Sequence, residues 1–109
     1  MGDKLMVVIP CYNEQEVLHE TARRLTLKMT ALVEAGLCGA DSRVLLVDDG
    51  SKDQTWAIIQ ELHQQNPLFE GLKLSRNRGH QNALLAGLMT ARTRCDFSIS
   101  MDADLQDDM

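Results

Sequence analysis

Two short apolar runs that end abruptly in polar residues limit most strongly how this chain can fold. Residues 5–9 and 43–47 are rich in Val, Leu and Ile, and they are followed at once by P-C-Y-N-E and D-D-G-S. A run of this length and composition is typical of a strand that is buried on both faces. Strands of this kind belong to parallel sheets with helices on both sides, so the pattern predicts an α/β fold.

Helical spacing of apolar residues fills the gaps between the expected strands. We expect Asn13 to cap a first helix, with Glu16 completing a capping box, and Gly36 to end it. The second helix is expected to start at Ser51 and to close before Pro67. The inward positions expected on these two helices are Leu18, Ala22, Leu25, Met29 and Leu32, then Trp56, Ile59 and Leu62.

The rest of the chain repeats the alternation of strand and helix. Residues 69–75 form a weaker third strand pattern, residues 83–91 a helix of small and apolar residues, and residues 97–101 a fourth strand. Pro10 is expected to end the first strand. The order predicts a Rossmann-like parallel sheet with right-handed crossovers and flanking helices.

Polar residues follow each expected strand, and the carboxyl ends of parallel strands lie at one edge of a sheet. Open α/β sheets bind their ligands at this edge. We therefore expect a ligand site built from four segments of the chain. They supply Tyr12, Asn13 and Glu14; Asp48 and Asp49; Arg76 and Asn77; and Asp102, Asp104 and Gln106.

The D-x-D pair Asp102 and Asp104 is the best candidate for a metal site. Two carboxylates about 5 Å apart repel each other by roughly 3 kcal/mol at an effective dielectric near 20, and a divalent cation would offset this repulsion. Carboxylate and amide oxygens are hard ligands, which favours Mg²⁺ or Mn²⁺. The alternative interpretation is a solvated acidic segment, because a D-x-D pair by itself is a weak signal.

Other polar residues at this edge have two interpretations each. V-D-D-G-S at residues 47–51 is either a turn or a base- and ribose-binding carboxylate next to a flexible glycine. Arg76 either contacts phosphate or pairs with an acidic neighbour. Cys11 is expected to be a buried thiol, and His80 is a candidate ligand contact near the start of the third helix.

Bulk composition excludes several classes of protein. The chain has 109 residues, 44% hydrophobic content and a net charge of −5. No basic stripe is present for nucleic-acid binding, so no nucleic-acid partner is expected. The apolar runs are far shorter than the roughly 20 residues that cross a membrane. Three widely spaced cysteines indicate neither a disulfide framework nor a zinc site, and we expect a cytoplasmic protein.

Four blocks of the sequence together resemble a known family. V-V-I-P-C-Y-N-E, L-L-V-D-D-G-S-K-D-Q-T, L-S-R-N-R-G-H-Q-N-A-L-L-A-G and M-D-A-D-L-Q-D are similar, in order and spacing, to the nucleotide-binding half of family-2 inverting glycosyltransferases of GT-A fold. The last two blocks look most like the polyprenyl-phosphate group, which includes dolichol-phosphate mannosyltransferase and the bactoprenol glucosyltransferases.

The resemblance implies roles for individual residues and a UDP-sugar or GDP-sugar donor. Pro10, Tyr12 and Glu14 would border the nucleotide, and Asp49, beside Asp48, would recognise the base or ribose. Asp102 and Asp104 would be the catalytic D-x-D pair. The remaining implied contacts are Arg76 and Ala103 for the nucleotide sugar and Gln106 as a further ligand of Mg²⁺ or Mn²⁺.

One departure keeps two acceptors open, a polyprenyl phosphate and a saccharide hydroxyl. The polyprenyl-phosphate group usually continues D-L-Q-D-P-P-E, whereas this chain continues D-L-Q-D-D-M. Members of the family are at least twice as long, so we interpret residues 1–109 as the nucleotide-sugar-binding part, with the acceptor wall and any general base beyond Met109. We also expect the missing part to be the route to membrane contact at the cytoplasmic face, and the bare fourth strand to pair with a second copy.

Two other classes fit parts of the pattern. A receiver-type signalling domain also opens with V-L-L-V-D-D, but here the acidic pair lies on the second strand and not on the first. A phosphatase of the haloacid dehalogenase type also has a D-x-D after a strand, but it would need Thr or Val at position 106, where Gln106 stands.

Overall fold

The protein alternates strands and helices from its first described strand to its last. The structure is a computed structural model, and it describes residues 4–74, 80–92, 95 and 97–100. The strands are β1 (Leu5–Cys11), β2 (Arg43–Asp48), β3 (Phe69–Lys73) and β4 (Phe97–Ser100). The helices are α1 (Leu18–Glu34), α2 (Thr55–Gln65) and α3 (His80–Ala91). This order confirms the predicted α/β fold.

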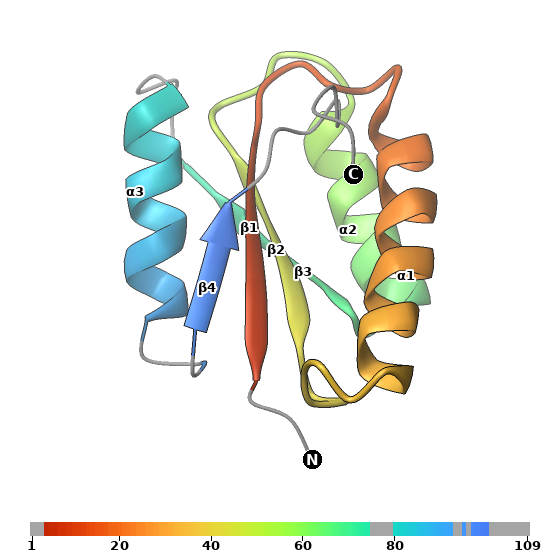
Figure 1. Cartoon of the computed structure of the whole chain (residues 1–109). Helices are drawn as coiled ribbons and strands as arrows, with labels where there is room; N and C mark the ends of the chain where they lie inside the picture. Colours follow the sequence, from red (N-terminus) through yellow and green to blue (C-terminus); the bar gives the residue numbers. More distant parts are fainter. Residues whose placement is uncertain (1–3, 75–79, 93–94, 96, 101–109) are drawn as a thin grey trace.

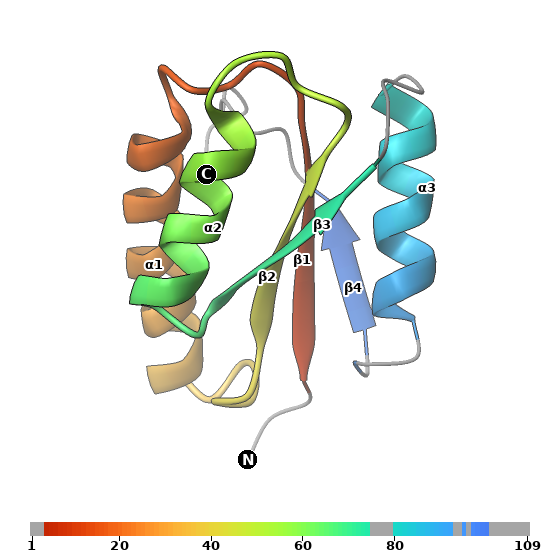
Figure 2. The same ribbon diagram turned by 180° about the vertical axis from the view of Figure 1, so that it is seen from behind.

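The four strands form one parallel sheet in the order β3-β2-β1-β4. Helices α1 and α2 cover one face of the sheet and α3 covers the other (Figures 1 and 2). The chain steps in one direction from β1 to β3 and then returns past β1 to β4. Crossovers of the same hand that run in opposite directions place their helices on opposite faces, as the predicted right-handed crossovers require.

The two faces of the sheet carry two hydrophobic clusters. Alternate residues of β1 point to opposite faces, so that Val7 and Ile9 pack under α1 and α2 while Met6 and Val8 pack under α3. The expected inward residues Leu18, Leu25 and Ile59 are buried in the first cluster. β1 and β2 are therefore buried on both faces, as their unbroken apolar sequences predict.

The predicted end of β1 is wrong by two residues, because Pro10 continues the strand. Pro10 lies opposite Val47, and the Cys11 carbonyl accepts the Asp49 N–H at 2.8 Å. Backbone groups of successive strand residues point to opposite neighbours, so the nitrogen of Pro10 faces away from β2. Pairing with β4 is described as far as Val8, and within the described residues the missing N–H of Pro10 interrupts no ladder bond.

The predicted starts of α1 and α2 are also wrong. α1 begins at Leu18 and α2 at Thr55, and neither has a side-chain cap bond. Asn13 and Ser51, the expected caps, bond instead to each other's loops, as described below. The predicted end of α1 is confirmed: Gly36 has φ 76°, and the N–H groups of Gly36 and Leu37 return to the carbonyls of Val33 and Leu32 in a Schellman motif.

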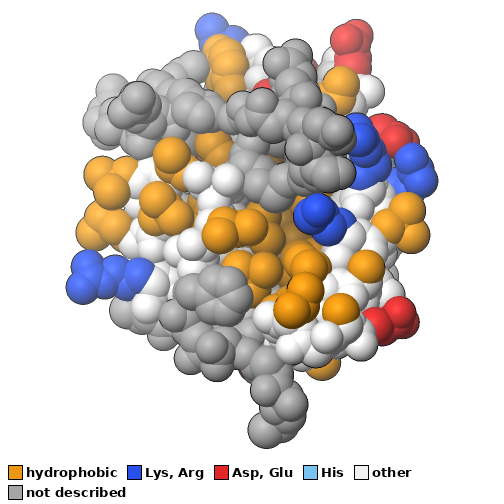
Figure 3. Space-filling view, in the orientation of Figure 1, with side chains coloured by type: hydrophobic (Ala, Val, Ile, Leu, Met, Phe, Trp, Pro, Cys, Tyr) orange, Lys and Arg blue, Asp and Glu red, His pale blue; other side chains and the backbone are white. Residues whose placement is uncertain are grey.

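The side of the molecule formed by α3 and β4 carries exposed hydrophobic side chains. Leu85 and Met89 on α3 and Ile99 on β4 remain exposed, and Figure 3 shows hydrophobic side chains gathered on this side. Within the described residues, β4 pairs with β1 along one edge and no strand is described along its other edge. No helix in the described part of the chain is long and apolar enough to cross a membrane.

Candidate functional site

The carboxyl edge of the sheet brings together the described residues that the sequence predicts as a site. Tyr12 and Glu14 lie in the loop that follows β1, and Asp48 and Asp49 lie where β2 ends. The hydrogen bond from the Asp49 N–H to the Cys11 carbonyl, 2.8 Å long, ties the two strand ends together. Tyr12 is exposed, whereas Asp48 and Asp49 are buried. The edge therefore combines an exposed aromatic side chain with two buried carboxylates.

Asp48 is buried completely, and its two carboxylate oxygens differ. Oδ1 accepts the Ser51 N–H at 3.2 Å, which closes the turn after β2. Oδ2 has no hydrogen-bond partner among the described residues. A buried acceptor without a partner is unfavourable by about 1–3 kcal/mol, and such groups in native structures often serve a ligand.

Negative charge at this edge acts on the buried thiol of Cys11. Burial raises the pKa of Cys11 far above its usual value, and the charges of Glu14 and Asp48 raise it further. The thiol therefore stays protonated at neutral pH, and as a neutral group it is a poor nucleophile. The expectation of a buried, unreactive Cys11 is confirmed, and all three cysteines are free.

Two loops form the wall of this edge. The β1 loop is residues 12–17 and the β2 loop is residues 49–54. Asn13 donates its N–H to Ser51 Oγ at 2.9 Å, and its Oδ1 accepts the Lys52 N–H at 2.9 Å. Glu14 donates its N–H to Thr55 Oγ1 at 2.8 Å. The two loops are thus joined directly, by bonds between residues about forty positions apart in the sequence.

Asp53 organises the start of α2 from within the β2 loop. Its Oδ1 accepts both the N–H and the hydroxyl of Thr55, and its Oδ2 accepts the Gln15 N–H at 3.3 Å. Partial desolvation acts to raise the pKa of the Asp53 carboxyl, but these hydrogen bonds together lower it. Its negative charge also lies next to the amino end of α2, where the helix dipole stabilises it.

The strand order marks one crevice at this edge as the place for a ligand. The chain reverses direction between β1 and β4, and open α/β sheets bind ligands outside the carboxyl ends of the strands at such a switch point. The β1 loop borders this crevice directly. In the sequence, the D-x-D segment follows β4 and begins at Asp102, two positions after Ser100.

Several predicted site residues lie outside the described residues: Arg76, Asp102, Ala103, Asp104 and Gln106. The backbone of His80 is described and begins α3. Among the residues that the structure describes, no cluster of three or more His, Cys, Asp or Glu side chains is arranged as a metal site. The metal assignment therefore stays a prediction.

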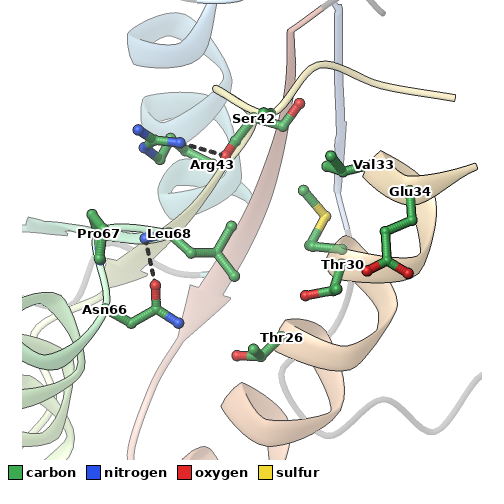
Figure 4. A pocket seen from close by; sticks show the side chains of 11 residues that line it. Thr26, Thr30, Val33, Glu34, Ser42, Arg43, Asn66, Pro67 and Leu68 are labelled. Carbon is green, nitrogen blue, oxygen red and sulfur yellow. Dashed lines mark hydrogen bonds between the residues drawn. The ribbon is translucent and has the colours of Figure 1, made fainter. Parts of the chain in front are cut away.

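A separate hollow lies at the opposite, amino-terminal end of the strands. It has a volume of about 430 Å³ and is lined by the second half of α1, the start of β2 and the segment before β3 (Figure 4). Thr26, Thr30, Glu34 and Asn66 give it a mixed polar rim around Met29. It lies at the end of the sheet away from the β1 and β2 loops and shares none of the predicted site residues.

Sequence reasoning missed the roles of Asn13, Ser51 and Thr55. Asn and Ser are common helix caps, so local spacing favoured caps for both. Their actual partners are about forty residues away, and only the fold brings them together. The one available signal was the concentration of Asn, Ser, Asp and Thr in both loops, which is more than two helix starts need.

A family profile matches nearly the whole chain. The profile described as "Glycosyl transferase family 2" matches residues 6–109. The chain belongs to this family. Its fold is that of the N-terminal region of GT-A glycosyltransferases, and the family resemblance seen in the sequence is confirmed.

Two relatives match nearly the whole chain by sequence. It is 53% identical over 105 residues to the uncharacterized glycosyltransferase YkoT of Bacillus subtilis, covering 96% of this chain and 31% of the relative. It is 38% identical over 104 residues to the undecaprenyl-phosphate 4-deoxy-4-formamido-L-arabinose transferase of an Enterobacter species, covering 94% of this chain and 29% of that one.

Solved structures agree on the fold. The mannosyltransferase PcManGT of Pyrobaculum calidifontis, in complex with GDP-Man and Mn²⁺, superposes with a TM-score of 0.76 at 22% identity and covers 95% of this chain and 28% of its own. S. aureus TarS in complex with UDP gives a TM-score of 0.68 at 24% identity, covering 93% and 27%. The family-2 chain described here thus spans less than a third of the length of each relative.

Proposed function

We propose that residues 1–109 form the nucleotide-sugar-binding part of a metal-dependent, inverting glycosyltransferase. The donor is a UDP-sugar or GDP-sugar, and the acceptor is a polyprenyl phosphate. The observation that carries the proposal is the meeting of the β1 loop, Asp48 and Asp49 at the switch point of a family-2 sheet. Within the described residues, the buried Oδ2 of Asp48 at that edge has no hydrogen-bond partner.

In the proposed complex, different residues of this edge contact different parts of the donor. Pro10, Tyr12 and Glu14 border the nucleotide, and Asp49, next to Asp48, accepts hydrogen bonds from base or ribose. Arg76 and Ala103 contact the diphosphate and sugar. Two structural neighbours were solved in complex with GDP-Man and with UDP, which is consistent with a nucleotide donor.

The donor set of the D-x-D segment fits a hard divalent cation. Asp102, Asp104 and Gln106 offer only oxygen ligands of the kind that Mg²⁺ and Mn²⁺ prefer. The cation would neutralise charge that develops on the diphosphate leaving group. The mannosyltransferase neighbour was solved with Mn²⁺.

The reaction is a single displacement at the anomeric carbon. The acceptor oxygen bonds to this carbon while the bond to the diphosphate oxygen breaks and the nucleoside diphosphate leaves with its electron pair. A polyprenyl phosphate oxygen is already anionic, so no proton needs to be removed. A relative whose name specifies undecaprenyl phosphate supports this acceptor.

A saccharide hydroxyl is the second candidate acceptor, and a specific observation favours it. Asp107 and Asp108 stand where the polyprenyl-phosphate group usually continues with Asp-Pro. A hydroxyl acceptor would need a general base within hydrogen-bond reach to take its proton. Transfer assays with the two acceptors decide between these candidates.

Calorimetry of UDP and GDP binding to the full-length protein, with Mn²⁺ and with EDTA, tests the proposal. Asp104→Asn should abolish most of the Mn²⁺ dependence, because it removes one carboxylate of the pair. Asp108→Asn makes the same change of charge nearby and is the matched control. Asp49→Ala should weaken UDP or GDP binding more than pyrophosphate binding. Equal nucleotide affinity of the unaltered protein in EDTA and in Mn²⁺ would contradict the metal assignment.

A further inference from the structure

Three successive residues of the β1 loop bond to the β2 loop and to Thr55, the first residue of α2. The N–H groups of Asn13, Glu14 and Gln15 donate to Ser51 Oγ, Thr55 Oγ1 and Asp53 Oδ2, respectively. Ser, Thr and Asp side chains often bond to backbone groups close to them in sequence, whereas these three accept bonds from a segment about forty residues away.

Asn13 is distinguished from its neighbours because it bonds in both directions. It donates its N–H to Ser51 Oγ and accepts the Lys52 N–H through Oδ1, both at 2.9 Å. Gln15 forms a second reciprocal link, since its Oε1 accepts the Gln54 N–H at 3.0 Å. The β2 loop is therefore held at both its middle and its end by side chains of the β1 loop.

The backbone of Asn13 adopts the left-handed conformation that this double bonding needs. Its φ is 54°, and it is the one non-glycine residue with positive φ in the described part of the chain. Asn tolerates this region better than most residues, but at some cost relative to glycine. Because Asn occupies this position although glycine would be less strained, we interpret the Asn side chain, and not only the turn, as useful here.

Tyr12 and Asp49, the proposed ligand contacts, lie next to residues that these hydrogen bonds hold in place. Tyr12 lies between Cys11, which is fixed in the sheet, and Asn13, which is fixed to the β2 loop. Asp49 begins the β2 loop and is fixed at its N–H by Cys11. The Asn13–Ser51 and Cys11–Asp49 hydrogen bonds thus close a circuit of the chain that includes Tyr12 and Asp49.

We infer that Asn13 is a positioning residue for the donor nucleotide, which locks the β1 loop to the β2 loop so that Tyr12 and Asp49 meet base and ribose in one fixed arrangement. The inference rests on the proposed function. Without the link the two loops would have to be ordered when the nucleotide binds, and this ordering would weaken binding. Metal and diphosphate contacts, which the D-x-D segment would supply, would be spared.

A matched set of variants tests this role in the full protein with Mn²⁺ present. Asn13→Gly keeps the positive φ but removes Oδ1, so UDP or GDP binding should weaken by about five- to tenfold. Asn13→Asp keeps an acceptor at the same place and should restore most of the affinity. Gln54→Ala is the control, because Gln54 joins the link only through its backbone N–H.

Pyrophosphate binding supplies the measurement that a purely structural role would not reproduce. Asn13→Gly should leave the pyrophosphate affinity within about twofold of the unaltered protein, at a temperature where thermal melts show both folded. Should that variant fail to fold, Ser51→Ala, which removes the acceptor of the Asn13 N–H, should show the same selective loss and Ser51→Thr should reverse it.

Two outcomes separate the inference from the function on which it rests. Unchanged nucleotide affinity in Asn13→Gly, or equal losses for nucleotide and pyrophosphate, would overturn the positioning role alone. Failure of the unaltered protein to bind UDP or GDP would overturn the proposed function and this inference with it.

Discussion

Gly87 packs α3 directly against the sheet, and adding one methyl group there should destabilise the protein. A Cβ at position 87 would lie 2.8 Å from Val47 Cγ2 and closer still to Val8 Cγ1. Ordinary carbon contacts are about 3.5–4.0 Å long. Both valines are fully buried on the two central strands, and β-branched side chains are stiff, so α3 itself must move outwards.

The expected loss for Gly87→Ala follows from two opposing terms. Overpacking a well-filled core typically costs about 1–3 kcal/mol, and two contacts this short place the cost near the upper end. Alanine is favoured over glycine inside a helix by about 1 kcal/mol, which offsets part of that cost. We expect the free energy of unfolding to fall by about 1–2 kcal/mol.

Urea unfolding followed by circular dichroism measures this loss, and a double-mutant cycle identifies its cause. Val8→Ala by itself should also destabilise, because it leaves a cavity under α3. Combined with Gly87→Ala, it makes room for the new methyl group, so the double variant should lose clearly less stability than the sum of the two single variants. Strict additivity, or a Gly87→Ala protein as stable as the original, would refute the steric argument.

Two further predictions concern the sheet and its edge. Burial and then the charges of Glu14 and Asp48 raise the pKa of the Cys11 thiol, so the unfolded chain loses this proton near pH 8.5 while the folded protein keeps it; urea titrations should show stability falling above that pH by up to about 1.4 kcal/mol per unit, and Cys11→Ala should remove this component. The 109-residue chain should sediment as a dimer through the outer edge of β4, Ile99→Lys should reduce the dimer, and a monodisperse monomer at high concentration would contradict the prediction.

The fold could be predicted from sequence because each signal it needed was local. Unbroken apolar runs indicated strands buried on both faces, and helical spacing indicated the faces of α1 and α2 that pack on the sheet. Gly36 ended α1 as expected, since a Schellman motif involves only neighbouring residues. Pro10 was misread because whether a proline interrupts a ladder depends on which neighbouring strand its nitrogen faces, which is not a local property.

The site could be predicted only in part, for a physical reason. Parallel topology was enough to place Tyr12, Glu14, Asp48 and Asp49 at one edge. It could not show that Asp48 is wholly buried with one oxygen bonded to the turn, because burial depends on how the loops close over the strand end. The bonds of Asn13 were likewise invisible, since each joins residues that only the finished sheet brings together.

The pairing of β1 with β4 has a consequence for the order in which the protein assembles. β1, α1 and β2 are consecutive in the sequence, so their contacts close a short stretch of chain, whereas Leu5 of β1 meets Phe97 of β4 across nearly the whole described sequence. Closing the longer loop costs more entropy, and we expect β4 to join the sheet late and to open first. Amide hydrogen exchange should then be faster in β4 than in β1, and the half of the proposed nucleotide-binding edge held by Asn13 would exist before β4 joins the sheet.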